Sequence, residues 1–303
     1  MENSLTNPFT SIVQLPDDCL YFIFQRLESS NDRESFGLTC HRWLHIQNSS
    51  RRSLQFQCSF TQLNPTSLSR PSTTINTFHL YRLLCRFPQL QSLSLSGCIE
   101  LPDSDHGFSF VAGGCPLLTI ISLYGCNVTD IGLESLSQSC STLKDVNLSF
   151  CSLISDHGIR AISPFSHHLR SVNISYCRNV TGVGFQGCSQ TLAYLEADSC
   201  KLEPEGISAI VSGGGLEYLN ISKLKSCIHG ISGWESIGSK CRNLERLHVN
   251  RCRNLSDQGL QALRDGCRRL RKLYLGRCRL ISSIAIEMFK CLRSDVQIMD
   301  EAT

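Results

Sequence analysis

A short pattern of apolar positions recurs along two-thirds of this 303-residue chain and restricts the folds that are open to it. An apolar residue, most often leucine, stands at positions 1, 4 and 6 of the pattern, and cysteine stands at position 9 in seven of the copies. Eight copies follow one another at intervals of 23 to 28 residues, and they begin at Leu90, Leu118, Leu143, Leu169, Leu192, Leu216, Leu244 and Leu270. Self-similarity at such a period is typical of a solenoid, in which stacked units bury a surface that one unit cannot bury alone.

Each copy predicts one short strand followed by one helix. Residues two apart, such as Leu93 and Leu95, point to the same side of a strand and so into a common core. In the second half of the units, Thr129, Ser155 and Ser256 stand where a helix N-cap belongs, and apolar residues follow at helical spacing. The spacing is that of leucine-rich repeats with cysteine in the Asn/Cys position. We therefore expect an α/β fold: a right-handed leucine-rich-repeat solenoid of about eight repeats over residues 90–299, an open arc with a parallel sheet on its concave face.

The 18 cysteines of the chain also follow the repeat. Seven occupy position 9, and four others precede a repeat by three residues: Cys115, Cys140, Cys241 and Cys267. No two cysteines have the Cys-X-X-Cys spacing of zinc and dithiol redox motifs. We expect most of them to be small buried hydrophobic residues, and we expect no catalytic residue, no metal site and no cofactor.

One glycine motif matches a nucleotide-binding pattern by spacing alone. Gly182, Gly184 and Gly187 satisfy the Gly-X-Gly-X-X-Gly rule. Gly184, however, occupies a position that glycine also holds in other units, and the motif does not directly follow its expected strand, as a phosphate-binding loop does. We interpret this motif as a turn of the repeat.

The composition indicates a folded chain without a membrane-spanning segment. Apolar residues make up 41% of it and charged residues 18%, which excludes a strongly charged disordered chain. No apolar run approaches the ~18 residues of a membrane span, and the first residues lack the basic and apolar stretches of a signal peptide. We expect the protein in the nucleus or the cytoplasm, where thiols stay reduced.

Residues 15–50 depart from the repeat and predict a small helical unit. Pro16 suits the first turn of a helix, and Asn31 or Asp32 is expected to cap a second one. The apolar face of the first helix consists of Leu20, Ile23, Phe24 and Leu27. A unit of this size is too small to be comfortably stable alone, so we expect it to pack on a partner, on the solenoid or on both.

Three motifs in this unit carry a resemblance to a known family. They are Leu15-Pro16 with Cys19-Leu20, Ile23-Phe24 with Leu27, and Cys40-His41-Arg42-Trp43. Together they resemble the F-box, which docks Skp-type adaptors, and an F-box before cysteine-containing leucine-rich repeats is similar to the F-box/LRR proteins, especially compact plant members. The resemblance implies a three-helix F-box over residues 12–53, with adaptor contacts at Leu15, Pro16, Leu20, Ile23, Phe24, Leu27 and Trp43. For Leu20, Leu27 and Trp43, packing inside the unit is the alternative interpretation.

The same resemblance implies the role of substrate receptor in an SCF-type ubiquitin ligase. Such a receptor is not itself an enzyme. It would bind the adaptor, and through it the cullin and RING subunits, while the arc presents a target protein for ubiquitination and proteasomal degradation. Residues 54–89 would hold a first strand, a loop and a degenerate first repeat. A free-standing LRR interaction scaffold, whose helical unit merely caps the solenoid, is the alternative function.

The outward residues of the strands are expected to line the concave face, where a target would bind. The candidate substrate-binding residues are Tyr124, Phe150, Tyr176, Arg246, His248, Arg251, Lys272, Tyr274 and Arg277. Residues 240–279 hold 12 Lys and Arg against three acidic residues, whereas the net charge of the whole chain is only +3. Like charges at equivalent positions of neighbouring strands repel each other unless an anion lies between them.

Three interpretations of this basic region are open. Duplication of one basic repeat, with solvated side chains, explains the charge without a ligand. An acidic or phosphorylated segment of the target protein would supply the missing anions. Nucleic acid is the third interpretation, but no stacking or groove-reading motif accompanies the charge.

Overall fold

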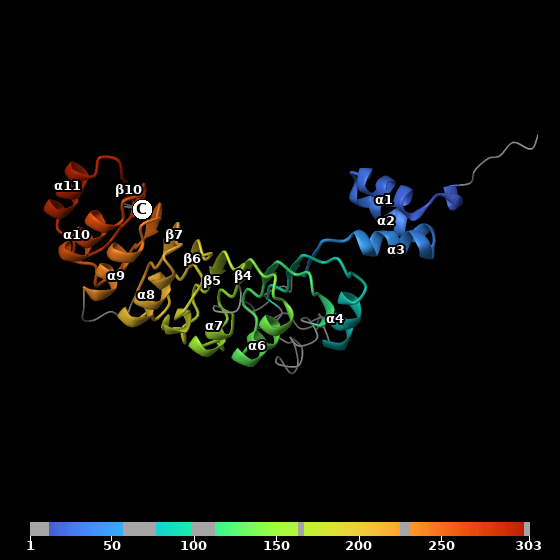
Figure 1. Ribbon diagram of the computed structural model, residues 1–303, viewed down its shortest axis with the longest axis horizontal. Coiled ribbons are helices and arrows are strands. Elements are labelled where there is room, and N and C mark those ends of the chain that lie inside the picture. Colours follow the sequence, from blue (N-terminus) through green and yellow to red (C-terminus); the bar gives the residue numbers. More distant parts are fainter. Residues whose placement is uncertain (1–11, 57–76, 98–112, 163–166, 225–230, 300–303) are drawn as a thin grey trace, which may run out of the picture.

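A computed structural model describes residues 12–56, 77–97, 113–162, 167–224 and 231–299. Ten strands form one parallel sheet, and each strand pairs with the next one along the chain, from β1 to β10. Figure 1 shows an open arc with the sheet on its concave side, helices α4 to α11 on its convex side, and helices α1 to α3 beyond its N-terminal end. The expected fold class, an α/β solenoid that does not close, is confirmed.

The strands have three residues each and differ mainly in their outward side chains. Their bounds are β1 Ser53–Gln55, β2 Ser92–Ser94, β3 Ile120–Ser122, β4 Asp145–Asn147, β5 Ser171–Asn173, β6 Tyr194–Glu196, β7 Tyr218–Asn220, β8 Arg246–His248, β9 Lys272–Tyr274 and β10 Gln297–Met299. The middle residue of β2 to β9 is buried in every case, as Leu93 and Leu273 are, because side chains alternate between the two faces of a strand.

The helices fall into two groups. The N-terminal group comprises the 3-10 turn η1 Ile12–Gln14 and the helices α1 Asp17–Arg26, α2 Ser30–Thr39 and α3 His41–Ser50. The convex group comprises α4 Thr77–Leu84, α6 Asp130–Ser139, α7 Asp156–Ile162, η2 Val183–Phe185, α8 Pro204–Ile210, η3 Val211–Gly213, α9 Ser232–Lys240, α10 Asp257–Gly266 and α11 Ser283–Leu292. One continuous apolar core lies between the convex group and the sheet.

The cysteines at position 9 form a ladder inside this core. Each donates its thiol hydrogen to a backbone carbonyl of the preceding unit, with S···O distances of 3.0 to 3.2 Å. The donors are Cys126, Cys151, Cys177, Cys200, Cys252 and Cys278, whereas Cys98 lies outside the described residues. Burial raises the pKa of the Cys151 and Cys200 thiols to about 12, so these groups stay neutral.

The glycine motif at residues 182–187 is a turn of the repeat, as its position indicated. It forms η2, which takes the place of a helix between α7 and α8. The carboxylate of Asp156 accepts hydrogen bonds from the backbone N–H groups of Thr181, Gly182 and Gly184 at 2.9 to 3.0 Å. A Cβ on Gly184 would lie 2.4 Å from the carbonyl oxygen of Asp156. The donors of this loop therefore bind a neighbouring repeat, and Gly182 and Gly184 permit close approach of two backbones.

The three N-terminal helices have a hydrophobic core of their own. Leu20, Phe24, Phe36 and Ile46 are buried together, apart from the core of the solenoid. The cap of α2 differs from the expectation of Asn31 or Asp32: the Ser29 hydroxyl accepts a hydrogen bond from the backbone of Asp32 at 3.4 Å. A hydroxyl one residue before the helix has the geometry of an N-cap, whereas a residue inside the first turn does not.

Candidate functional site

The turn that follows each strand gives the concave side a distinctive edge. In four of these turns, at Cys126, Cys151, Cys177 and Cys252, the N–H of the position-9 residue donates to the carbonyl three residues earlier, as Cys151 does to Leu148 at 3.1 Å. The third residue of the turn has a φ of 56° to 74°, the requirement of a type II turn. These third residues, which we call the left-handed column, are Gly97, Gly125, Phe150, Tyr176, Ser199, Lys223, Arg251 and Arg277.

Six members of the left-handed column are not glycine, although glycine adopts this conformation at least cost. The left-handed region costs other L-residues roughly 1–2 kcal/mol each. Five of the six are aromatic or cationic, and only Ser199 is small. A strained backbone that repeatedly carries large functional side chains marks this edge as a candidate binding surface.

The first part of the column carries an exposed aromatic stack. Phe150 lies parallel to Tyr176 with ring centroids 4.3 Å apart, and Tyr124 tilts against Phe150 at 5.3 Å. Phe150 keeps 46% of its surface exposed and Tyr124 38%. The structure thus brings together three of the predicted substrate-binding residues, and their exposed rings offer a surface for an apolar side chain.

The positive charge of Lys223, in the middle of the left-handed column, is balanced by an ion pair within the protein. The Lys223 ammonium lies 2.9 Å from a carboxylate oxygen of Asp198 and 3.3 Å from the Tyr176 hydroxyl. It also lies 5.5 Å from the centre of the Tyr176 ring. The hydrogen bond to Asp198 raises the pKa of Lys223, so this ammonium stays charged at neutral pH.

A second aromatic row crosses the strands beside the column. His248 stacks on Tyr274 with ring centroids 3.8 Å apart, and Tyr218 follows at 5.2 Å from His248 and 6.2 Å from Tyr194. Tyr194 and Tyr218 are not among the residues predicted from the sequence. They occupy the first position of β6 and β7, the same column as Arg246 and Lys272, and extension of that column along the repeats would have found them.

The carboxylate of Glu196, beside this row, also has hydrogen-bond partners within the protein. Glu196 accepts hydrogen bonds from the Tyr218 hydroxyl at 2.6 Å and from the Asn220 amide at 2.7 Å. Burial, reinforced by Glu196, raises the pKa of Tyr218, so the phenol remains a donor.

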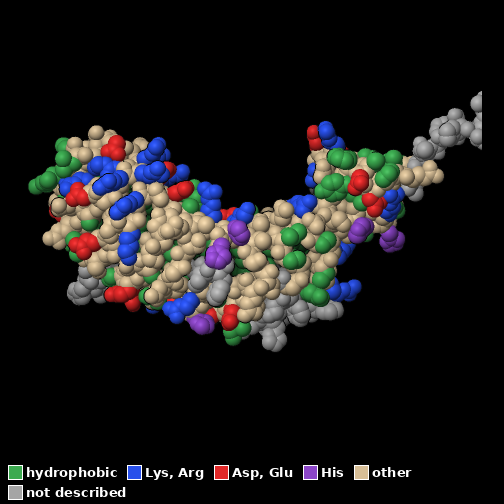
Figure 2. All heavy atoms as spheres, in the orientation of Figure 1, with side chains coloured by type: hydrophobic (Ala, Val, Ile, Leu, Met, Phe, Trp, Pro, Cys, Tyr) green, Lys and Arg blue, Asp and Glu red, His purple; other side chains and the backbone are tan. Residues whose placement is uncertain are grey.

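The C-terminal end of the concave face holds four cations on two neighbouring repeats. Arg246 and Lys272 are register partners on β8 and β9, and the backbone N–H of Arg251 donates to Gly276 just before Arg277. All four side chains are exposed, and within the described part of the chain none of them forms a hydrogen bond or an ion pair. Figure 2 shows Lys and Arg gathered over this end of the arc. Cations at this spacing, about 4.8 Å per strand, form a site for anionic oxygens.

The predicted adaptor-binding residues lie mainly inside the helical unit. Leu20 is 0% exposed and Phe24 only 8%, so these two side chains form the core. Leu15, Ile23, Leu27 and Trp43 are half-buried and pack against that core. Pro16 alone among the seven is largely exposed, at the start of α1. Leu20 and Phe24 thus pack inside the unit, and an adaptor contact by any of the seven residues stays a prediction.

Two exposed apolar residues of the helical unit were missed. Phe22 on α1 is 66% exposed, and Leu38 on α2 is 85% exposed. Figure 2 shows hydrophobic side chains gathered on this unit. The signal in the sequence was a large apolar residue off the apolar face of its helix, which is typical of a surface that a partner covers.

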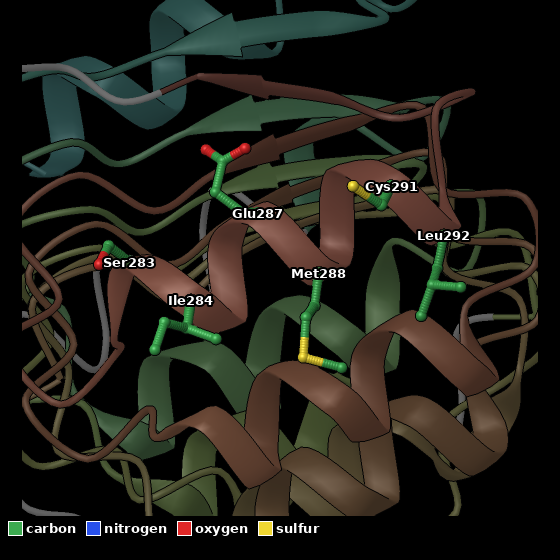
Figure 3. A pocket seen from close by; sticks show the side chains of 6 residues that line it. All are labelled: Ser283, Ile284, Glu287, Met288, Cys291 and Leu292. Carbon is green, nitrogen blue, oxygen red and sulfur yellow. The ribbon is translucent and has the colours of Figure 1, made fainter.

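A hollow of about 510 Å³ lies on the last helix of the solenoid. Its apolar side chains Ile284, Met288 and Leu292 point from the same side of α11 (Figure 3). All residues that line it belong to this one helix, so it is an open depression without converging polar groups.

Among the described residues, no three His, Cys, Asp or Glu side chains lie together as metal ligands would. No helix in the described ranges combines the length and the apolar character that crossing a bilayer requires.

The comparisons with known proteins match both parts of the chain. A family model described as Leucine Rich repeat matches residues 114–137, 139–163, 165–186 and 240–263. F-box/LRR-repeat protein 12 of Arabidopsis thaliana is 54% identical over 288 residues, which cover 87% of this chain and 73% of that protein. F-box/LRR-repeat protein 4 of Bos taurus is 30% identical over 80 residues, which are 26% of this chain and 13% of that protein.

Solved structures match the fold alone. An internalin (inlF) of Listeria monocytogenes superposes with a TM-score of 0.50 and 18% identity, covering 73% of this chain and 64% of the internalin. A complex of TLR13 with ssRNA13 superposes with a TM-score of 0.58 and 14% identity, covering 84% of this chain and 33% of the other.

Proposed function

The chain belongs to the F-box/LRR-repeat proteins, and from that premise we propose that it is the substrate-recognition subunit of an SCF-type ubiquitin ligase. The helical unit would bind a Skp-type adaptor and, through it, the cullin and RING subunits. The concave face would bind a target protein for ubiquitination and proteasomal degradation, in the nucleus or the cytoplasm. In this assembly the chain itself carries out no chemical step. Family membership over nearly the whole chain is the observation that carries this proposal.

The helical unit supports the first half of the proposal. Its core is separate from that of the solenoid, so it can serve as a docking module of its own. It also exposes apolar residues, Phe22 and Leu38, at which a partner would bury surface. The unit is joined to the sheet through β1 and two cationic side chains: Arg51 lies over the Phe87 ring at 5.2 Å, and Arg52 donates to Gln89 at 2.8 Å.

The concave face supports the second half. Its outward side chains change along the arc from aromatic to basic, and several of them have no partner within the described chain, Arg251 and Arg277 among them. A surface that carries unsatisfied charge and exposed rings on a rigid scaffold is suited to bind an extended partner.

Affinity capture from cells under proteasome inhibition tests the proposal. We expect the wild-type chain to recover a Skp-type adaptor together with a cullin. Pro16→Ala combined with Phe22→Ala and Leu38→Ala should reduce that recovery about tenfold or more, because exposed apolar contacts are lost without a cavity in the core.

Leu153→Ala is the matched control, since Leu153 is an exposed leucine of the solenoid at 50%. It should leave adaptor recovery unchanged. Unchanged recovery with the triple variant, or no adaptor with the wild-type chain, would favour a free-standing LRR scaffold.

A further inference from the structure

The strain in the left-handed column is offset inside the protein at some positions and not at others. Phe150 and Tyr176 stack on each other, and Lys223 binds Asp198 and Tyr176. These contacts offset the unfavourable backbone at three positions. Arg251 and Arg277 have the same backbone conformation but no side-chain hydrogen bond or ion pair among the described residues. At these two positions no side-chain hydrogen bond or ion pair with a described residue offsets the backbone strain.

The turn itself does not require these arginines. Gly97 and Gly125 occupy the same position of the same turn in the first two described repeats. Glycine is the least strained choice there, so Arg251 and Arg277 satisfy a need that lies outside the backbone. Duplication of one repeat explains why the two are alike, but it does not explain why a strained residue remains in both.

The charge around the two arginines indicates what they bind. Arg246 and Lys272 lie on the same two repeats, at the first positions of β8 and β9, and they face each other one strand spacing apart, as Arg251 and Arg277 do. The acids Glu196 and Asp198, on β6 and directly after it, already accept hydrogen bonds from Tyr218, Asn220 and Lys223. An anionic ligand is therefore needed to balance the basic end.

The aromatic stack lies at a fixed distance from this end. From the midpoint of Phe150 and Tyr176 to the midpoint of Arg251 and Arg277, the column crosses four strand spacings. At about 4.8 Å per strand this is about 19 Å, which an extended peptide spans with about six residues at roughly 3.3 Å each.

We propose that the left-handed column binds an extended segment of the target protein with two anchors. One anchor is a large apolar or aromatic side chain on the Phe150–Tyr176 stack. The other, about six residues away, is a pair of carboxylates or a phosphate held by Arg251 and Arg277. This assignment rests on the proposed function, since it describes the segment that a substrate receptor would recognise.

Labelled synthetic peptides and the full-length chain provide the test, with fluorescence anisotropy as the measurement. The reference peptide holds one Trp, five Gly and Ser residues, and then Glu-Gly-Glu. We expect peptides with one or eleven spacer residues, and a peptide with Gln in place of Glu, to bind at least about fivefold more weakly. A phosphoserine in place of Glu-Gly-Glu distinguishes the two anions, and the tighter of the two peptides identifies the natural group.

Variants of the protein assign each anchor. Arg251→Gly with Arg277→Gly should weaken the reference peptide about tenfold or more without unfolding the chain, because glycine suits both turns. Arg268→Ala with Arg269→Ala removes the same charge between α10 and β9 and should change affinity less than about twofold. Phe150→Ser should abolish the difference between the reference peptide and its Trp→Ser form.

Two results would overturn the inference. One is affinity that depends neither on the spacer nor on the two arginines. The other is tighter binding of a 12-nucleotide single-stranded RNA that the same arginine variant weakens, which would assign the surface to nucleic acid. Adaptor capture by these variants should equal that of the wild-type chain. Failure of the peptide assay with intact adaptor capture would leave the ligase role in place.

Discussion

Replacement of Arg251 by glycine should raise the stability of the solenoid, although it removes the whole side chain. Arg251 has a φ of 57°, in the left-handed region, and its side chain forms no hydrogen bond or ion pair with any described residue. The variant therefore relieves backbone strain and loses no internal contact of known value. Arg277, with a φ of 61°, should respond in the same way.

The expected size of the effect follows from two opposing contributions. The left-handed conformation costs a non-glycine residue roughly 1–2 kcal/mol in the folded state. Glycine, in turn, increases the conformational entropy of the unfolded chain, which costs about 0.4–1 kcal/mol. The free energy of unfolding should therefore rise by about 0.8 kcal/mol at the middle of these ranges, and Tm by about 2–3 °C for a domain of this size.

Thermal and urea unfolding, followed by circular dichroism, measure this change. Arg268→Gly is the control, because Arg268 is exposed but not in the left-handed region, and the variant should lower the free energy of unfolding by about 0.5 kcal/mol. Phe150→Gly should also be destabilising, since two ring contacts worth about 0.5–1.5 kcal/mol each are lost with the strain. If Arg251→Gly destabilises the chain as much as Arg268→Gly does, the strain argument is wrong.

Three further predictions concern the packing and the thiols of the solenoid. Asp156→Ala removes the acceptor of four hydrogen bonds from Thr181, Gly182 and Gly184. Urea titrations should show a free energy of unfolding lower by about 2–3 kcal/mol. An unchanged urea midpoint would show that the neighbouring turn is stable without this carboxylate. Burial raises the pKa of Cys151 from 9.0 to about 12, so the folded chain holds a proton that the unfolded chain releases, and stability should fall as the pH rises from about 9 towards 12. At pH 8 exposed Cys291 should react with a thiol reagent in seconds to minutes and the buried thiols only after denaturation; rapid reaction of all thiols would contradict their burial.

The repeat unit itself was determined by the local sequence. A strand of three residues with a buried centre, as at Leu93 or Leu273, follows from apolar residues two apart, because side chains alternate across a strand. Eight copies in register then imply stacking, a parallel sheet and an open arc. The positions of Arg246 and Lys272 opposite each other also follow, since equivalent residues of neighbouring repeats become register partners.

The tertiary structure decided which of these residues are satisfied within the chain. Lys223 is bound by Asp198, 25 positions earlier, whereas Arg251, at the equivalent position of the next repeat, is not bound by any described side chain. In the helical unit Leu20 is fully buried and Ile23 only half-buried, although both belong to the apolar face of one helix. The repeat pattern reports only which face of an element a residue occupies. Whether a charged side chain has a hydrogen-bond partner depends on which side chains meet when separate units stack. The extent of burial depends on how the helices pack against one another. Neither is encoded in the local spacing of residues.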